Sequence, residues 1–211
     1  MQSVALINYG SGNLRSAEKA LIRAADGKSA IVVTDDPDVI ANADRIVLPG
    51  VGAFAACMAA FEARPGVSEA MTEAVHGKGA PFLGICVGMQ LLASRGLEFG
   101  ETAGLDWIAG DVRRLESHDP AIKIPHMGWN GLTEVSDQPV FAGLNDGQTV
   151  YFTHSFAFFP KDERDVAAYV DHGGRFPAAV ARGNVAGVQF HPEKSQAAGL
   201  ALLARFLEWR P

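Results

Sequence analysis

The feature that most constrains the fold of this chain is a cysteine between two glycines, at a point where an apolar run gives way to helix-forming residues. The segment from 81 to 90 reads PFLGICVGMQ, with Cys86 at its centre. A strand that turns sharply into a helix exposes the side chain at the turn, and a helix N-terminus favours a thiolate there. Flanking glycines let neighbouring backbone approach closely. We therefore predict that Cys86 is a nucleophile rather than a buried structural cysteine.

Short apolar segments alternate with helical patterns before residue 94, which is typical of a parallel sheet covered by helices. Strands are expected at 4–7, 30–33, 46–48 and 82–85, and helices at 14–24, 53–61 and 67–76. Beyond Ser94, frequent glycines predict short strands joined by hairpins, at 111–115, 132–135, 149–153, 167–170, 178–181 and 185–190. A last helix is expected from about Ser195. The predicted fold is α/β: a three-layer, mostly parallel sheet flanked by helices, with an antiparallel β extension, in a single domain of residues 1–211.

Composition excludes several classes of protein. The chain has 211 residues, 48% of them hydrophobic, and its 24 acidic and 18 basic residues give a net charge of −6. It therefore lacks the basic field that holds nucleic acid or an anionic membrane. Its two cysteines form no disulfide framework, and we find no signal peptide or apolar run that spans a bilayer. We expect a cytoplasmic protein.

A cysteine nucleophile needs a general base, and that base needs a group that orients it. His191 follows the apolar segment 185–190, so we expect it at the carboxyl end of a strand, where parallel sheets bind ligands and where Cys86 also lies. The carboxylate of Glu193, two residues on, can accept the imidazole N–H and stabilise the imidazolium. Alternatively, His191 is a loop residue and Glu193 a favourable charge at a helix start. No second ligand lies at metal-binding spacing from His191. Three other histidines are expected at the surface: His76 near a helix end, and His118 and His172 in polar stretches.

Acyl transfer also needs N–H donors for the developing oxyanion. The backbone N–H of Val87, next to the nucleophile, is one candidate. The other is Val51, because Gly50 and Gly52 on either side leave the backbone free to aim an N–H inward. An ordinary glycine-rich turn is the alternative interpretation.

Two stretches together carry a resemblance to a known family, GICVGMQ at 84–90 and QFHPEKS at 189–195. Both resemble the signature stretches of the class I glutamine amidotransferases, which use a Cys-His-Glu triad. Four more blocks, spread from end to end, are similar to the glutaminase subunits of imidazole glycerol phosphate synthases: NYGSGNL at 8–14, PGVGAF at 49–54, PHMGWN at 125–130 and YFTHS at 151–155.

The resemblance implies a flavodoxin-like core and hydrolysis of L-glutamine to glutamate and ammonia. Cys86 would be the nucleophile, His191 the proton carrier and Glu193 its partner, and no cofactor is implied. The ammonia would pass to a (β/α)₈ cyclase subunit in a heterodimer. That partner makes imidazole glycerol phosphate and aminoimidazole carboxamide ribotide in histidine biosynthesis.

The resemblance also implies roles for further residues. Those that would help to bind glutamine are Gly50, Gly52, Gln90, Glu98, His154, Ser155 and Phe156. Those that would lie at the partner interface are Asn13, Trp129, Tyr151 and Lys194. Each interface residue also has a structural interpretation, such as a helix cap for Asn13 or a core position for Trp129. Phe156 departs from the family, whose members often carry tyrosine there, and so removes a hydroxyl from the substrate pocket. Val87 replaces the commoner leucine, which changes little because its N–H is the functional group.

Three alternatives remain from the sequence. The first is the glutaminase of another amidotransferase, such as pyridoxal phosphate synthase, which does not account for the blocks at 8–14 and 125–130. The second is a dinucleotide-binding protein, suggested by Gly10 and Gly12 after the first strand. Its fingerprint is incomplete, because Arg15 stands at the third glycine position. The third is a catalytically dead interaction module on the same fold.

Overall fold

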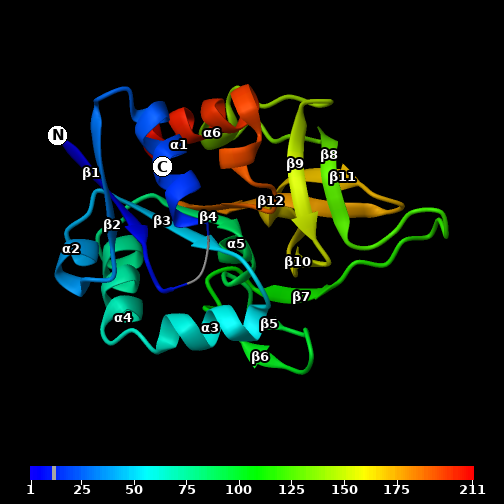
Figure 1. Cartoon of the computed structure of the whole chain (residues 1–211), viewed down its shortest axis with the longest axis horizontal. Helices are drawn as coiled ribbons and strands as arrows, with labels where there is room; N and C mark the ends of the chain where they lie inside the picture. The colour runs from blue at the N-terminus through cyan, green and yellow to red at the C-terminus, as the bar shows by residue number, and fades with distance from the viewer. Residues whose placement is uncertain (11–12) are drawn as a thin grey trace.

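One long sheet flanked by helices is the main feature of the computed structural model, which describes residues 1–10 and 13–211 (Figure 1). Its strands are β1 (Gln2–Ile7), β2 (Ser29–Thr34), β3 (Arg45–Gly50), β4 (Phe82–Cys86), β8 (His126–Thr133), β9 (Thr149–His154), β11 (Val166–Asp171), β12 (Arg175–Arg182) and β13 (Val185–Val188). Within the described residues their order is β2-β1-β3-β4-β13-β12-β11-β8-β9. The strands from β2 to β13 in this order are parallel, and those from β13 to β9 are antiparallel.

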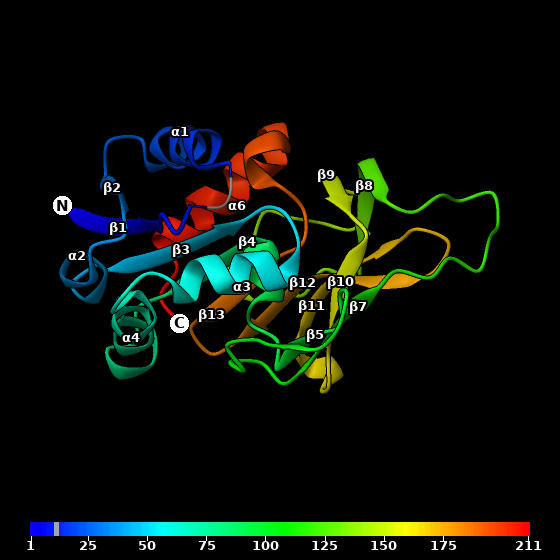
Figure 2. The same ribbon diagram turned by 60° about the horizontal axis from the view of Figure 1, so that its bottom comes forward.

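Helices cover both faces of the parallel part (Figures 1 and 2). On one face lie α1 (Leu14–Ala25) and α6 (Gln196–Glu208), and on the other lie α2 (Pro37–Ala41), α3 (Phe54–Glu62) and α4 (Val67–Thr72). The buried side chains of α1 are Ala17, Leu21 and Ala25, which recur at the four-residue spacing of one helix face. No helix among the described residues is long and apolar enough to cross a membrane.

A second, smaller sheet lies beside the antiparallel part. Its strands, in order, are β10 (Phe156–Pro160), β7 (Gly110–Arg114), β5 (Arg95–Gly96) and β6 (Thr102–Ala103). Only Ser155 separates β10 from β9, so the chain passes from one sheet to the other at that residue. The residues on both sides of Ser155 are thereby fixed by two different sheets.

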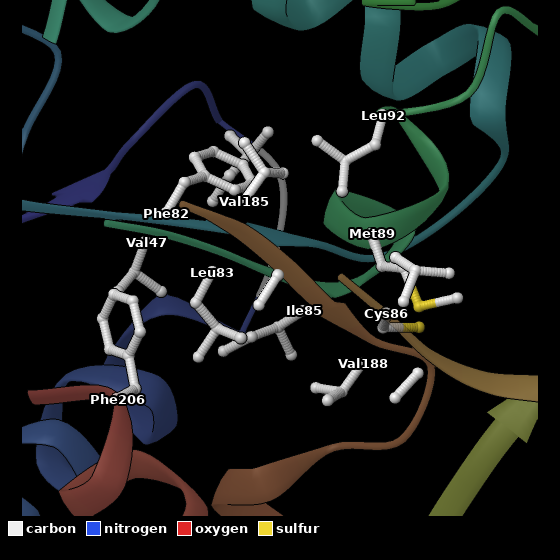
Figure 3. Packing of buried hydrophobic residues seen from close by; sticks show 14 of the residues in the cluster. Val47, Phe82, Leu83, Ile85, Cys86, Met89, Leu92, Val185, Val188 and Phe206 are labelled. Carbon is white, nitrogen blue, oxygen red and sulfur yellow. The ribbon is translucent and has the colours of Figure 1, made fainter. Parts of the chain in front are cut away.

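The turn after β4 is held by close packing of backbone against backbone. β4 is buried along its whole length between β3 and β13, and α5 (Val87–Gln90) follows it directly (Figure 3). A Cβ atom added to Gly88 would overlap the carbonyl oxygen of Leu48 in β3, and one added to Gly50 would lie 2.7 Å from the backbone nitrogen of Gly88. Glycine is therefore required at these positions because α5 lies directly against the end of β3.

Replacing Gly88 with alanine should destabilise the protein by about 3 kcal/mol, because the atoms in the way belong to the backbone of a central strand and have no room to move. Gly131→Ala is the matched control, since its Cβ would lie no closer than 3.6 Å to any neighbour. Chemical denaturation measures both. Equal stability of the two variants would contradict this account of the turn.

The predicted fold class is confirmed, and the differences lie in individual elements. The helix after Cys86 is a single turn, and the helix expected over 67–76 ends as α4 at Thr72 and continues as a π-helical turn, Glu73–Gly77. Asn13 occupies the N-cap of α1, but its carbonyl rather than its side chain receives the helix N–H groups. Part of the expected turn over residues 8–13 lies outside the described residues. The strand expected at 132–135 is β8, which begins earlier, at His126, and ends at Thr133. α2, β5, β6 and β10 were not predicted.

Candidate active site

Cys86 is held in a backbone conformation that is rare for any residue except glycine. Its φ is 55° and its ψ −112°, at the junction of β4 with α5. Such conformations cost of order 1–3 kcal/mol and persist only where the surroundings impose them, as the packing around Gly88 does here. The predicted strand-to-helix turn with cysteine at its apex is therefore present.

His191 and Glu193 form a buried pair beside this cysteine. His191 Nδ1 donates a hydrogen bond to Glu193 Oε1 at 2.8 Å, and both side chains are only 3% exposed. The Nδ1 proton leaves Nε2 as the nitrogen available for chemistry, and Nε2 has no hydrogen-bond partner of standard geometry among the described residues. Burial lowers the pKa of His191, but its interactions with Cys86 and Glu193 outweigh this effect and raise the pKa to about 9. The site is thus built to hold an imidazolium next to the sulfur.

The backbone around His191 is fixed by the neighbouring strand β9. The N–H of His191 donates to the carbonyl of Tyr151 at 2.9 Å. The hydroxyl of Ser195 donates to the carbonyl of His191 at 2.7 Å and accepts the N–H of Tyr151 at 3.0 Å. His191 is therefore anchored on both sides of its Cα, which holds the imidazole in place before any substrate binds.

Sequence reasoning missed a residue that contacts Cys86. Gln189 is fully buried, and its Nε2 donates to Cys86 Sγ at 3.6 Å. Side chains alternate along an extended segment, so Gln189 points to the same side as His191 while Phe190 points into the core and packs edge-on against Phe152. That two-residue spacing was the available signal.

A cavity of about 360 Å³ opens beside Cys86. The predicted site residues that line it are Val51, Gly52, Cys86, Val87, Gln90, Glu98, His154, Ser155, Phe156, His191 and Lys194. Gly50 does not line it, because it packs against Gly88 beneath the surface. Glu193 lies behind His191. A larger and more open depression of about 820 Å³ lies at the amino ends of β1, β3 and β4, around Arg45 and Arg210. It contains no triad residue, so the smaller cavity is the candidate active site.

Both predicted oxyanion donors, Val51 and Val87, line this cavity. Val87 is the first residue of α5, so its N–H belongs to the free N-terminus of that turn. Val51 is 49% exposed, and its carbonyl accepts a hydrogen bond from the thiol of Cys57 at 3.4 Å. Cys57 thus has a structural contact with the loop that carries Val51. The role of both N–H groups stays a prediction.

Glu98 and Gln90 both make hydrogen bonds within the protein. Glu98 Oε2 accepts the backbone N–H of Phe54 at 2.8 Å, at the N-terminus of α3. Gln90 Nε2 donates to the carbonyl of Phe156 and to Gln189 Oε1, both at 2.9 Å. These bonds fix the directions of the two side chains on the cavity wall, and each retains one oxygen beyond those bonds that can accept from a ligand.

Behind the cavity lies a chain of histidines. His154 Nδ1 faces the carbonyl of Phe156 at 2.9 Å and therefore carries a proton; its Nε2 then accepts from His126 Nδ1 at 3.0 Å. His126 Nε2 in turn accepts from Asn130 at 3.2 Å. His172, expected at the surface, is instead half-buried and stacks on His126 with ring centroids 4.0 Å apart. Burial lowers the pKa of His126 to about 3 and that of His154 to about 4.

These two histidines should make the protein acid-sensitive. In the unfolded chain histidine binds a proton below about pH 6.5, while folded His126 and His154 stay neutral to about pH 3 and 4. Stability should therefore fall as the pH drops from 6.5 towards 4, measured by urea unfolding at pH 7 and pH 5. His126→Leu should reduce this pH dependence, and His118→Leu, at an exposed position, should not. An identical pH dependence in both variants would contradict the prediction.

Three of the four predicted interface residues lie together. Trp129 and Tyr151 are paired across β8 and β9, with their rings edge-to-face at 5.9 Å, and Lys194 Nζ lies 5.6 Å from the Tyr151 ring centroid. Trp129 is 47% exposed and its neighbour Met127 is 65% exposed. We call Met127, Trp129, Tyr151 and Lys194 the Trp129 surface. Lys194 also lines the cavity, so this surface adjoins the candidate active site. Asn13 is exposed at the start of α1.

Among the described residues, no group of three His, Cys, Asp or Glu side chains is arranged to hold a metal ion. The chemistry that the arrangement can perform is acyl transfer to a thiolate, with one histidine that moves the proton.

Comparison with known proteins gives the family. A profile of the family described as "Glutamine amidotransferase class-I" matches residues 5–209. The imidazole glycerol phosphate synthase subunit HisH of Caulobacter vibrioides is 64% identical over 214 residues, which cover 100% of both chains. The subunit of the same name from Zymomonas mobilis is 54% identical, covering 99% of this chain and 97% of its own.

Solved structures agree on the fold alone, because their sequences are distant. A glutamine amidotransferase superposes with a TM-score of 0.70 at 19% identity, covering 97% of each chain. The glutaminase domain of Trypanosoma brucei CTPS, solved with bound acivicin, gives a TM-score of 0.67 at 16% identity, covering 100% of this chain and 96% of that one. The chain therefore belongs to the class I glutamine amidotransferases, among the HisH subunits of imidazole glycerol phosphate synthase.

Proposed function

We propose that this chain hydrolyses L-glutamine to glutamate and ammonia, as the glutaminase subunit of an imidazole glycerol phosphate synthase in histidine biosynthesis. The observation that carries the proposal is the position of Cys86 on a strained turn in one cavity with His191, whose other nitrogen is bound to Glu193. The identity to HisH subunits along the whole chain supports the choice of this synthase among the class I amidotransferases.

In the first half of the reaction, the thiolate of Cys86 attacks the carboxamide carbon of glutamine. The negative charge that develops on the carbonyl oxygen is stabilised by the N–H groups of Val51 and Val87. The imidazolium of His191 then gives its Nε2 proton to the amide nitrogen, and ammonia leaves. A γ-glutamyl thioester on Cys86 remains. The raised pKa of His191 suits this step, because the proton must be present at neutral pH before it is transferred.

In the second half, His191 acts as the base. It takes a proton from water, the resulting hydroxide attacks the thioester, and the thiolate of Cys86 leaves as glutamate forms. Glu193 holds the Nδ1 proton throughout and so keeps Nε2 towards the reacting atoms. Gly52, Gln90, Glu98, His154, Ser155 and Phe156 form the wall that would hold the glutamine. Gly50 would act indirectly, through the position of Val51.

The ammonia would pass to a (β/α)₈ cyclase subunit bound at the Trp129 surface. A half-exposed tryptophan braced by an aromatic neighbour is a frequent anchor of protein interfaces. Because Lys194 belongs both to this surface and to the cavity wall, a partner bound there would lie next to the place where ammonia forms.

Glutamate release from glutamine, by this protein alone and with a cyclase partner and its ribotide ligand, tests the proposal. We expect the partner to increase the rate. Trp129→Ala should raise the Kd of the complex roughly 30-fold, as loss of a central anchor does, whereas Val32→Ala, on the distant edge strand β2, should not change it. A rate indifferent to the cyclase would point to another amidotransferase, such as that of pyridoxal phosphate synthase. Folded protein without any activity would point to an interaction module.

A further inference from the structure

The side chain of Gln189 contacts the sulfur of Cys86, and the mechanism above gives it no role. It is fully buried, and its Nε2 lies 3.6 Å from Cys86 Sγ. It extends from the same backbone segment as His191, two residues earlier, so the same extended chain presents both side chains to the cysteine. Burying an amide costs free energy that an apolar side chain of the same size would avoid. The hydrogen bond to the sulfur, rather than the filling of space, therefore accounts for a glutamine at this position.

The direction of this amide is fixed by a second one. Gln90 Nε2 donates to the carbonyl of Phe156, which identifies it as the nitrogen end, and it also donates to Gln189 Oε1. If Gln189 were turned over, its N–H₂ would face the N–H₂ of Gln90 and its oxygen would face the sulfur. The chain from Phe156 through Gln90 to Gln189 therefore keeps a donor directed at Cys86.

We propose that Gln189 is a catalytic residue that stabilises the thiolate of Cys86 by donating its side-chain N–H to the sulfur. A thiol is a weak acceptor and a thiolate a strong one, so the hydrogen bond favours the charged form. Burial strengthens the effect, because water does not compete for the sulfur on that side. The inference relies on the proposed function in one respect, that Cys86 is the nucleophile.

The same donor acts twice in a turnover. It stabilises the thiolate that attacks glutamine, and it stabilises the thiolate that leaves when the thioester is hydrolysed. In the thioester the sulfur carries no charge, so the hydrogen bond from Gln189 is weaker in that state. Loss of the donor should therefore reduce kcat more than it changes KM.

The test measures alkylation of Cys86 by iodoacetamide against pH, on the full chain without glutamine or cyclase, with the Cys86 peptide quantified by mass spectrometry. Gln189→Met has nearly the same length and no N–H, and should move the midpoint of the profile up by about one pH unit. It should also lower kcat in the complex roughly tenfold, with KM nearly unchanged. Gln189→Glu can still accept from Gln90 but places a negative charge near the sulfur, so its midpoint should move further in the same direction.

Asn184→Leu is the matched control. Asn184 also carries a partly buried amide, which donates to the carbonyls of Val75 and Ala80, but it lies at the other end of β13 from Gln189. Its alkylation midpoint should stay at the wild-type value. The other titratable groups on the cavity wall, Glu98, His154, His191 and Lys194, are the same in every variant.

Folded variants at Gln189 with the wild-type alkylation midpoint would overturn the inference. If Gln189→Met does not fold, Gln189→Glu decides the question by the same readout. Because alkylation needs neither glutamine nor a partner, its failure can be told apart from failure of the proposed function: a shifted midpoint in a protein without glutaminase activity would show that Gln189 stabilises the thiolate and would refute the proposed reaction.

Discussion

Cys86→Ala should lower kcat for glutamate release from glutamine by on the order of 10⁵-fold, because the reaction loses the atom that forms the thioester. The stability of the protein should change little, since alanine keeps the Cβ and removes a single sulfur from the cavity wall. The measurement is glutamate formation by the complex at saturating glutamine, together with a thermal melt of the variant.

Cys57→Ala is the matched control for loss of a thiol. Cys57 is buried on α3, and its thiol bonds to the carbonyl of Val51 rather than to a reacting atom, so this variant should retain glutaminase activity. If Cys86→Ala kept its rate within tenfold of wild type, the thiolate mechanism would be wrong.

Glu193→Gln should lower kcat by on the order of 10³-fold, because a neutral amide no longer stabilises the imidazolium and its NH₂ group can hold the imidazole in the wrong tautomer. It should also change the pH dependence. The pKa of His191 is about 9, and below it the imidazolium is present, so the alkaline limb of kcat/KM should have its midpoint near pH 9. Removing the carboxylate removes an attraction for the imidazolium, which lowers that pKa. The midpoint should therefore move to lower pH.

The pH profiles of kcat/KM for wild type, Glu193→Gln and Glu62→Gln measure this effect. Glu62 is exposed at the end of α3, so its variant removes one negative charge without touching His191. It should reproduce the wild-type midpoint. The interpretation of Glu193 as the partner of His191 fails if its variant keeps both the wild-type rate and the wild-type alkaline limb.

Local patterns were sufficient to predict the turn at Cys86. Gly84 and Gly88 each lie two residues from the cysteine in sequence. Both positions require glycine because the backbones of neighbouring elements pack directly against them. To predict that His191 lies near Cys86, one further rule was needed: the carboxyl ends of parallel strands lie on the same side of a sheet. The rule applies here because β13 pairs directly with β4, in parallel.

The contacts that the sequence did not predict depend on pairing between distant strands. The bond between His126 and His154 exists because the register of β8 and β9 places these residues opposite one another, and no local pattern encodes that register. Gln189 was missed although its two-residue spacing from His191 was a usable signal, because its contact with Cys86 becomes visible only when β13 is placed beside β4. α2 carried a usable signal, since Asp36 caps it by accepting the N–H of Asp38.

The most direct test of the central claim follows the amide nitrogen of glutamine. The complex of this protein with a (β/α)₈ cyclase is given glutamine labelled with ¹⁵N in the amide, together with the cyclase's ribotide substrate and excess unlabelled ammonium at a pH where little of it is free ammonia. We predict that the imidazole product carries ¹⁵N, and that the Cys86→Ala complex makes product only from added ammonia. Unlabelled product from the wild-type complex, with glutamate still formed, would show that the ammonia is not passed to this partner and would contradict the proposed function.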